Sequence, residues 1–314
     1  MIFRLKAETE VWTGNASRRN ESLQISGLLG CIRWWAEVLT RGAGGYACDP
    51  VSQRCRRTAP CLICWLFGGV GEGHEKNAPL PRAARFFVRA WQDEEGEAGH
   101  KPPLSTLQTQ ALIKDMLKDT LLALEFRFWG KAAEPWEVYT LDKAIRLICS
   151  YGLGGGRTPY RPSAYTEKPS CGHLTLRECG SISGGQWVAR SDSDRSRDRS
   201  AWEQKVKAAS GKASPHYAPE LKSFWSLDGW SLYNCRTEPF QLPSFQWLKS
   251  HLAGRRGAGA DKPISAKVFS CTDPRRTWGY LPDSVSRDHL KTWLTEADAD
   301  TTQITWGETM LKEI

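Results

Sequence analysis

The chain has 314 residues, which corresponds to about two domains of ordinary size. Hydrophobic residues make up 40% of it and charged residues 25%, a composition typical of globular proteins that argues against disorder over most of the sequence. No stretch approaches the roughly 18 apolar residues of a membrane span, and the charged N-terminus is unlike a signal peptide. These features predict a cytoplasmic protein with no membrane partner.

The charge balance is positive, with 43 Lys and Arg against 35 Asp and Glu and a net charge of +8. Such an excess favours a polyanionic partner, most simply a nucleic acid, although a mildly basic soluble protein is the plain alternative. The 15 tryptophans leave a similar choice open, because indole rings fill cores and also stack on bases.

Apolar residues in the first half of the chain follow the periods of regular secondary structure. Residues 2–11 alternate between apolar and charged side chains, which is the pattern of a half-buried strand. In residues 27–41 the apolar side chains recur every three or four positions, as on one face of a helix. The same reasoning predicts strands at 83–91 and 120–129 and a helix at 135–150 that Gly152 ends. This order favours an α+β, ferredoxin-like fold similar to that of RRM domains.

The second half of the chain is less periodic. Residues 172–190 contain two short strand candidates, and residues 191–200 (SDSDRSRDRS) are a low-complexity, charge-balanced stretch that predicts a mobile surface loop or linker. Shorter elements are expected further on, at 201–209 (helix), 264–271 (strand), 285–294 (helix) and 301–306 (strand). We therefore predict a first domain at 1–165 and a second, less regular domain at 166–314.

Ten cysteines without a secretion signal favour thiols or metal ligands over disulfides. Four of them, Cys48, Cys55, Cys61 and Cys64, share the spacing C-x6-C-x5-C-x2-C within a Gly- and Pro-rich insertion at 42–64. Zinc needs four such ligands in a tetrahedron, and the insertion has too few apolar residues to fold by itself. We predict structural zinc without catalysis, because four thiolates leave no open position for water. Four unliganded thiols, or His74 in place of one cysteine, remain as alternatives.

Three groups of residues have the chemistry of a phosphate site. Glycines at a helix start allow close backbone approach, and N–H groups at a helix N-terminus attract phosphate. A run of glycines can also expose successive N–H donors, although it can equally be a flexible turn. Trp34 either packs against a second domain or meets a base. The residues that could bind a nucleic acid are Arg18, Arg19, Ser26, Gly27, Arg33 and Trp34, the zinc-loop residues Arg54, Arg56 and Arg57, and Gly154, Gly155, Gly156, Arg157, Tyr160 and Arg161.

The first half of the chain resembles a known superfamily. Residues 21–39 (ESLQISGLLGCIRWWAEVL) are similar to the first helix of the RAMP proteins of type III CRISPR effectors. The two tryptophans after Arg33 are most similar to the Cmr-one family of type III-B (Cmr) complexes. CWLFGG at 64–69 resembles the Phe-Gly segment that follows this helix, and GLGGGRTPYRPS at 152–163 resembles the glycine-rich loop of the superfamily. The resemblance covers about residues 1–165.

This resemblance implies two ferredoxin-like RAMP domains and a role in antiviral defence. It implies a non-catalytic, RNA-binding subunit of a type III-B-like ribonucleoprotein, which would cap the filament near the guide RNA 3′ region. Guide (CRISPR) RNA, target RNA and other RAMP subunits are the expected partners. A metal-independent RNA endonuclease of the same superfamily is one alternative, although the first 73 residues contain no histidine to serve it. A structural adaptor that binds only protein is the other.

Overall fold

The computed structural model describes residues 1–9, 11, 23–49, 55, 59–69, 83–93, 119–152, 172–184, 186–210, 218–232, 242–244, 268–272 and 274–313. Described residues up to 210 belong to one compact unit and those from 218 onward to a second. Each unit contains an antiparallel sheet with helices, so the predicted α+β class is confirmed. None of the helices described is long and apolar enough to cross a membrane.

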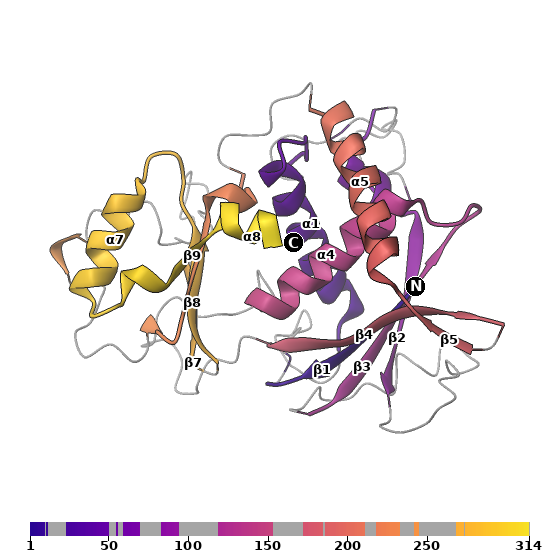
Figure 1. Ribbon diagram of the computed structural model, residues 1–314, viewed down its shortest axis with the longest axis horizontal. Helices are drawn as coiled ribbons and strands as arrows, with labels where there is room; N and C mark the ends of the chain where they lie inside the picture. Colours follow the sequence, from indigo (N-terminus) through magenta and orange to yellow (C-terminus); the bar gives the residue numbers. More distant parts are fainter. Residues whose placement is uncertain are drawn as a thin grey trace, which may run out of the picture. The chain divides into compact units, whose positions relative to one another are not determined.

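The first unit is built on a five-stranded sheet (Figure 1). Its strands lie in the order β2-β3-β1-β4-β5, and every neighbouring pair is antiparallel. The first four strands therefore have the ferredoxin-like order that the sequence predicted. The elements are β1 (Ile2–Ala7), α1 (Ile25–Gly42), α2 (Leu62–Phe67), β2 (Phe86–Asp93), β3 (Leu121–Phe128), α4 (Pro135–Tyr151), β4 (Leu174–Ser183), β5 (Gln186–Ala189) and α5 (Asp192–Ala208).

Alternation along β1 gives the sheet one apolar and one charged face. Phe3 and Leu5 are buried, and the ring of Phe3 meets the edge of Phe126 from β3 at 5.7 Å. On the other face Arg4 forms ion pairs with Asp93 at 3.2 Å and Glu178 at 2.9 Å. The period of two therefore places Phe3 and Leu5 on the face opposite Arg4, and the face of Arg4 also carries a small buried cluster of Ile2, Trp91 and Ala123.

Helices cover the apolar face of the sheet (Figure 1). The predicted stripe of α1 is buried, including Ile32 and Trp35. Helix α4 begins at Pro135 with a capping box, because the side chain of Glu137 accepts the N–H of Glu134 at 2.9 Å. Its predicted end is confirmed at Gly152, which has φ +81°.

Residues 191–200 form the start of α5, so the prediction of a mobile loop there is wrong. Ser191 Oγ accepts from the N–H of Asp194 at 3.1 Å, which begins the helix, and Arg–Asp pairs three residues apart continue it. Only Asp198, Trp202 and Val206 are buried on this helix. The low-complexity composition obscured a helix that charge pairing and two apolar anchors stabilise.

The predicted domain boundary at residue 165 also differs from the structure. Strand β4 pairs with β1 along its length, from Ile2 opposite Gly180 to Ala7 opposite Leu174. Because β4 completes the first sheet, the described residues 172–210 belong to the first unit. A boundary drawn from local composition could not register a pairing between residues so distant in the chain.

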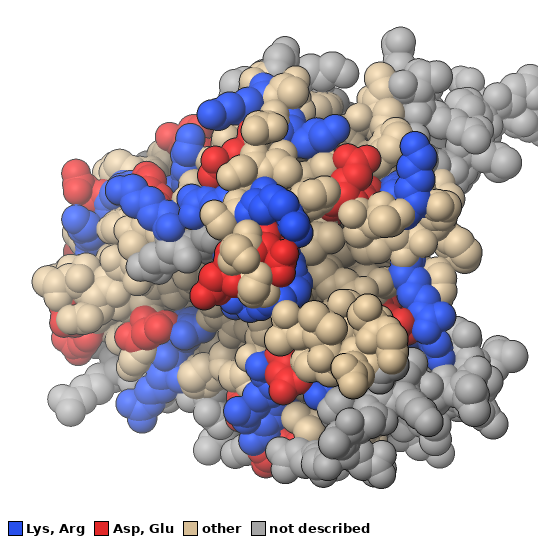
Figure 2. Space-filling view, turned by 45° about the vertical axis from the view of Figure 1, so that its right-hand side comes forward, with Lys and Arg blue, Asp and Glu red and all other residues tan. Residues whose placement is uncertain are grey.

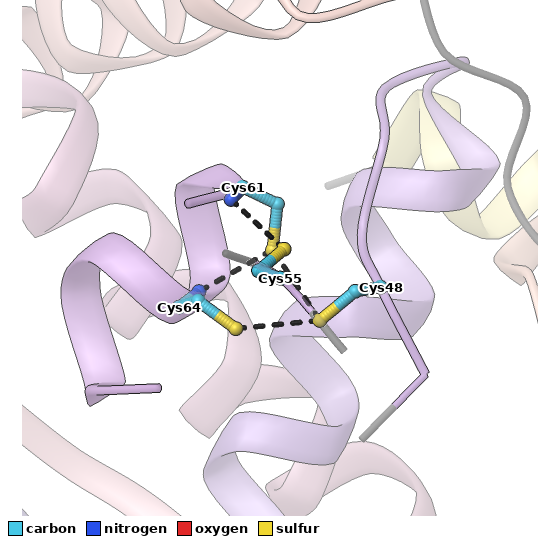
Figure 3. A group of neighbouring side chains, drawn as sticks. All are labelled: Cys48, Cys55, Cys61 and Cys64. Carbon is cyan, nitrogen blue, oxygen red and sulfur yellow. Dashed lines mark hydrogen bonds between the residues drawn. The ribbon is translucent and has the colours of Figure 1, made fainter. Parts of the chain in front are cut away.

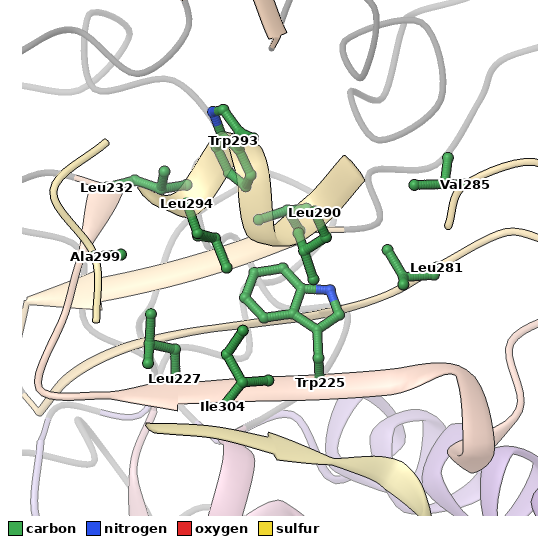
Figure 4. Close-up of a cluster of buried hydrophobic side chains, with 11 residues drawn as sticks. Trp225, Leu227, Leu232, Leu281, Val285, Leu290, Trp293, Leu294, Ala299 and Ile304 are labelled. Carbon is green, nitrogen blue, oxygen red and sulfur yellow. The ribbon is translucent and has the colours of Figure 1, made fainter. Parts of the chain in front are cut away.

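The second unit repeats the strand order with different side chains. Its sheet runs β7-β8-β6-β9, all antiparallel, which is again the ferredoxin-like order. Trp225, Trp293 and Leu290 centre its core (Figure 4). Cys271 of β7 is disulfide-bonded, against the expectation of free thiols. The elements are η2 (Leu221–Ser223), β6 (Phe224–Asp228), β7 (Val268–Thr272), β8 (Arg275–Tyr280), α7 (Arg287–Glu296), η4 (Thr301–Gln303), β9 (Ile304–Trp306) and α8 (Gly307–Glu313).

Candidate metal centre

The four cysteines of the predicted motif converge in the first unit. Cys48 follows α1, Cys61 and Cys64 lie at the start of α2, and Cys55 comes from the segment between them. Their sulfur atoms all lie within 4.8 Å of one another and their side chains point toward a common centre (Figure 3). The structure thus brings together all four predicted ligands, and His74 lies outside the described residues.

Local sequence explains how each end of the motif is placed. Cys61 is the N-cap of α2, and its sulfur accepts the N–H of Cys64 at 3.4 Å, so the C-x2-C pair lies on one helical turn. After α1 the chain turns through Gly44, which has φ +84°. A Cβ on Gly45 would lie 2.8 Å from the Val206 side chain, so the close approach to α5 requires glycine there.

The spacing of the sulfurs fits a single metal ion. Metal–sulfur bonds of about 2.3 Å in a tetrahedron place sulfurs about 3.8 Å apart. Cys48 Sγ lies 3.8 Å from Cys61 Sγ and 3.3 Å from Cys64 Sγ. An iron–sulfur cluster inserts sulfide ions between its iron atoms and needs its cysteines farther apart. The donor set is therefore that of a mononuclear, four-thiolate centre.

Hydrogen bonds among the four sulfurs lower the pKa of two thiols, Cys55 and Cys61, and raise the pKa of Cys48 and Cys64. The thiol of Cys48 hydrogen-bonds to Cys55 and lowers the pKa of Cys55 to about 7. Hydrogen bonds from Cys48 and the other two thiols also lower the pKa of Cys61, whereas those to Cys55 and Cys61 raise the pKa of Cys48. The backbone N–H of Cys61 donates to Cys55 Sγ at 3.2 Å. Thiolates are the form in which cysteine binds metal.

Arg33 is a predicted RNA contact that the structure places beside this cluster. Its three guanidinium nitrogens donate to Glu37 Oε1 at 2.9 Å, the Gly68 carbonyl at 2.7 Å and Cys64 Sγ at 3.3 Å. Burial alone would lower the pKa of Arg33, but Glu37 and Cys64 outweigh it and raise that pKa. These contacts fix the orientation of the guanidinium, and the RNA contact of Arg33 stays a prediction.

Two residues near the cluster were missed at the sequence level. Glu37 and the buried Arg41 follow Arg33 at intervals of four, on one side of α1. Arg41 donates to the carbonyls of Ala47 at 3.0 Å and Cys48 at 2.8 Å, and Glu37 bridges both arginines. The signal available was the charged spacing Arg-x3-Glu-x3-Arg running into the cysteine motif.

The remaining predicted RNA residues fall into two groups. Ser26 and Gly27 are exposed in the first turn of α1, and Trp34 is half-buried with its ring 4.9 Å from that of Trp35. The other residues lie outside the described part of the chain, and their roles stay predictions: Arg18, Arg19, Arg54, Arg56, Arg57, Gly154, Gly155, Gly156, Arg157, Tyr160 and Arg161.

Comparison with known proteins establishes the class of this chain. A sequence model of the RAMP superfamily matches residues 4–160, half of the chain. The chain therefore belongs to the RAMP superfamily. No curated protein matches it. Among solved structures it is similar to the crystal structure of Cmr1 from Pyrococcus furiosus (apo form), with a TM-score of 0.43, 10% identity and 98% of each chain covered.

Proposed function

We propose that this chain is a non-catalytic, RNA-binding subunit of a type III-B-like CRISPR ribonucleoprotein. In this role it caps the filament near the guide RNA 3′ region and contacts guide RNA, target RNA and neighbouring RAMP subunits. Membership of the RAMP superfamily is the observation that carries the proposal. Two sheets of ferredoxin-like order support it, because RRM domains bind single-stranded RNA with the same topology.

The distribution of charge indicates where RNA contacts belong. Described residues contain as many Asp and Glu as Lys and Arg, so the entire net charge of +8 lies outside them. On the face drawn in Figure 2, Lys and Arg side chains accordingly lie beside Asp and Glu side chains. The positive excess that attracts a phosphate backbone therefore resides in segments such as those of Arg18, Arg54 and Arg157.

We also propose zinc as the metal of the cysteine centre. Four buried or half-buried sulfurs at mononuclear spacing are the ligand set that structural zinc prefers. Zinc, when bound, would cross-link the insertion to α2 without activating a water molecule, because no ligand position stays open. Cys48, Cys55, Cys61 and Cys64 would hold it. Mass spectrometry of freshly purified protein tests this proposal, with about one zinc per chain expected.

Salt dependence of RNA binding tests the electrostatic mode. We expect the logarithm of affinity for single-stranded RNA to fall steeply and linearly with the logarithm of salt concentration, because bound cations are released from RNA. Replacing Arg157 with alanine should weaken binding for all sequences alike and reduce that slope by about one unit. A flat salt dependence would contradict binding through phosphates.

Two further assays separate the alternatives. Incubation with repeat RNA in EDTA would yield a discrete product if the chain were a metal-independent endonuclease. If the chain were a protein-only adaptor, it would bind candidate RAMP subunits in size-exclusion chromatography but retain no RNA on a filter. Our proposal expects RNA retention, no cleavage, and association with RAMP subunits.

A further inference from the structure

Three charged residues of α1 form two linked ion pairs next to the cysteine centre. Arg33, Glu37 and Arg41 are joined by ion pairs of 2.9 Å (Arg33–Glu37) and 3.5 Å (Arg41–Glu37). All three side chains are largely shielded, with exposed fractions of 18%, 8% and 2%. Shielded charges of this kind need compensating partners, and here the two arginines leave one positive charge in excess of the single carboxylate.

The excess charge is directed at the sulfurs. Arg33 Nη2 lies 3.3 Å from Cys64 Sγ, and its remaining nitrogens are fixed by Glu37 and the carbonyl of Gly68 at the end of α2. The guanidinium therefore contacts both the ligand within α2, Cys64, and the C-cap of that helix, Gly68. Four thiolates around a divalent metal carry a net charge of −2, which an arginine donor at this distance offsets.

Arg41 holds the other side of the same centre. It donates to two successive carbonyls, of Ala47 and Cys48, and so fixes the backbone at the first ligand. Glu37 connects this anchor to Arg33. One helix face thus contacts two of the ligand residues, Cys48 through Arg41 and Cys64 through Arg33.

We propose that Arg33 is a positioning residue of the metal centre, acting through its hydrogen bond to the Cys64 thiolate, with Glu37 and Arg41 as its supports. This inference rests on the proposed metal centre and deepens it. It assigns to the first helix of the chain a structural role in metal retention. Groups that hydrogen-bond to metal ligands typically contribute 10- to 100-fold to metal affinity.

The test compares Arg33→Met with a matched control, Arg85→Met. Arg85 is equally shielded (16% exposed) and has the same partner types, Glu137 at 3.1 Å and the Trp129 carbonyl at 2.7 Å, but no sulfur. Competition with a chromogenic chelator would measure affinity for Co²⁺ and Zn²⁺. We expect Arg33→Met to lose about 10- to 100-fold in affinity and Arg85→Met to retain the wild-type value.

Cobalt absorption gives a second readout that a purely structural role would not change. Loss of the N–H···S bond raises the energy of the sulfur electrons, so the thiolate-to-Co²⁺ charge-transfer band of Arg33→Met should shift to longer wavelength. Arg33→Lys keeps a positive charge and a single donor nitrogen but lacks the planar fork of arginine, so its affinity and band should be intermediate. If Arg33→Met does not fold, Arg33→Lys still allows the role of Arg33 to be tested.

The outcomes distinguish the proposed role of Arg33 from the proposed metal centre on which it rests. If wild-type protein shows no four-thiolate cobalt spectrum, the metal centre itself is wrong. If wild type binds one metal ion and folded Arg33→Met matches it in affinity and spectrum, the centre stands and the role of Arg33 is wrong. Equal losses in Arg33→Met and Arg85→Met would likewise overturn the role, because the effect would then be general destabilisation.

Discussion

The two sheets share a strand order, yet different side chains hold the helices of each unit in place. In the first unit shielded ion pairs and thiols add to the buried apolar stripe of α1, as in Arg33–Glu37, Arg85–Glu137 and the cysteine cluster. In the second unit Trp225 and Trp293 are fully buried among aliphatic side chains, as Figure 4 shows. The described ion pairs of that unit, such as Arg287–Glu308, are at the surface. One topology therefore tolerates two sources of stability.

This difference has a chemical consequence. Thiolates and ion pairs respond to chelators, pH and salt, because their energy depends on charge. Burial of indole rings responds chiefly to loss of volume and contact. The two units should therefore lose their folded structure under different treatments. Each of the following experiments tests whether the stability of one unit changes without that of the other.

The largest expected effect is loss of the metal. Cys61→Ser removes a ligand but keeps a hydroxyl that can cap α2, so bound zinc should fall from about one per chain to near zero. Amide hydrogen exchange should accelerate around α1 and α2, while protection of β6 and β8 is unchanged. Cys31→Ser, on α1 outside the cluster, is the control and should keep the metal. Lost protection in both units would contradict independent stabilisation.

Truncation of a core indole should have the next largest effect. Trp293→Ala deletes a side chain with no exposed surface, at a cost of about 3–5 kcal/mol. Denaturant unfolding would show the loss in the second unit alone, with zinc content retained. Trp129→Ala is the matched control, because its indole is 57% exposed and should change stability by less than about 0.5 kcal/mol. Metal loss in Trp293→Ala would show that the units depend on each other.

A smaller effect is expected at the start of α5. Ser191→Ala removes the N-cap hydroxyl, at a cost of about 1 kcal/mol to the first unit, measurable by denaturant unfolding. The Ser191 side chain and N–H lower the pKa of Asp194, so this carboxylate stabilises the fold above its ordinary pKa of 3.8. That contribution is lost as pH falls through the lowered value. In Ser191→Ala, an NMR titration should show the Asp194 pKa closer to 3.8; an unchanged value would refute the cap.

The smallest effect should come from an exposed pair on the same helix. Arg199 and Glu203 lie 2.9 Å apart, and both side chains are more than 40% exposed. Arg199→Ala should cost at most about 0.5 kcal/mol, and that cost should vanish at high salt. Arg85→Met, which removes the partner of a fully buried carboxylate, should cost several times more by denaturant unfolding. Similar costs for the two would show that burial of the pair is unimportant.

Periodicity predicted the elements whose apolar faces pack on a sheet. β1, α1 and α4 begin and end within a few residues of the predicted limits, because their stripes of apolar residues are long and regular. The cysteine cluster could also be predicted from the sequence, because its four ligands are close together in the chain. Helix α5 could not be predicted in this way. Its charged residues stabilise it through ion pairs, but by composition alone the segment looks the same as a disordered, charge-balanced stretch.

The role of Arg33 shows a different limit. From its place after a glycine-bearing helix start, the sequence predicted an RNA contact. That contact stays a prediction, whereas the structure shows Arg33 donating to Cys64 and Gly68, which are more than thirty residues away in the chain and become adjacent only when α2 packs beside α1. Local pattern can identify a chemically capable side chain, but the fold decides which partner that side chain meets.

The pairing of β1 with β4 affects how the protein is made. Arg4 of β1 contacts Glu178 of β4, so one edge of β1 stays unpaired until a strand 174 residues further along the chain has been synthesised. At about 5–20 residues per second, the ribosome leaves that edge open for roughly ten to thirty seconds. An open strand edge readily pairs with a foreign strand. Nascent chains of this protein therefore have a defined period in which a chaperone would protect them.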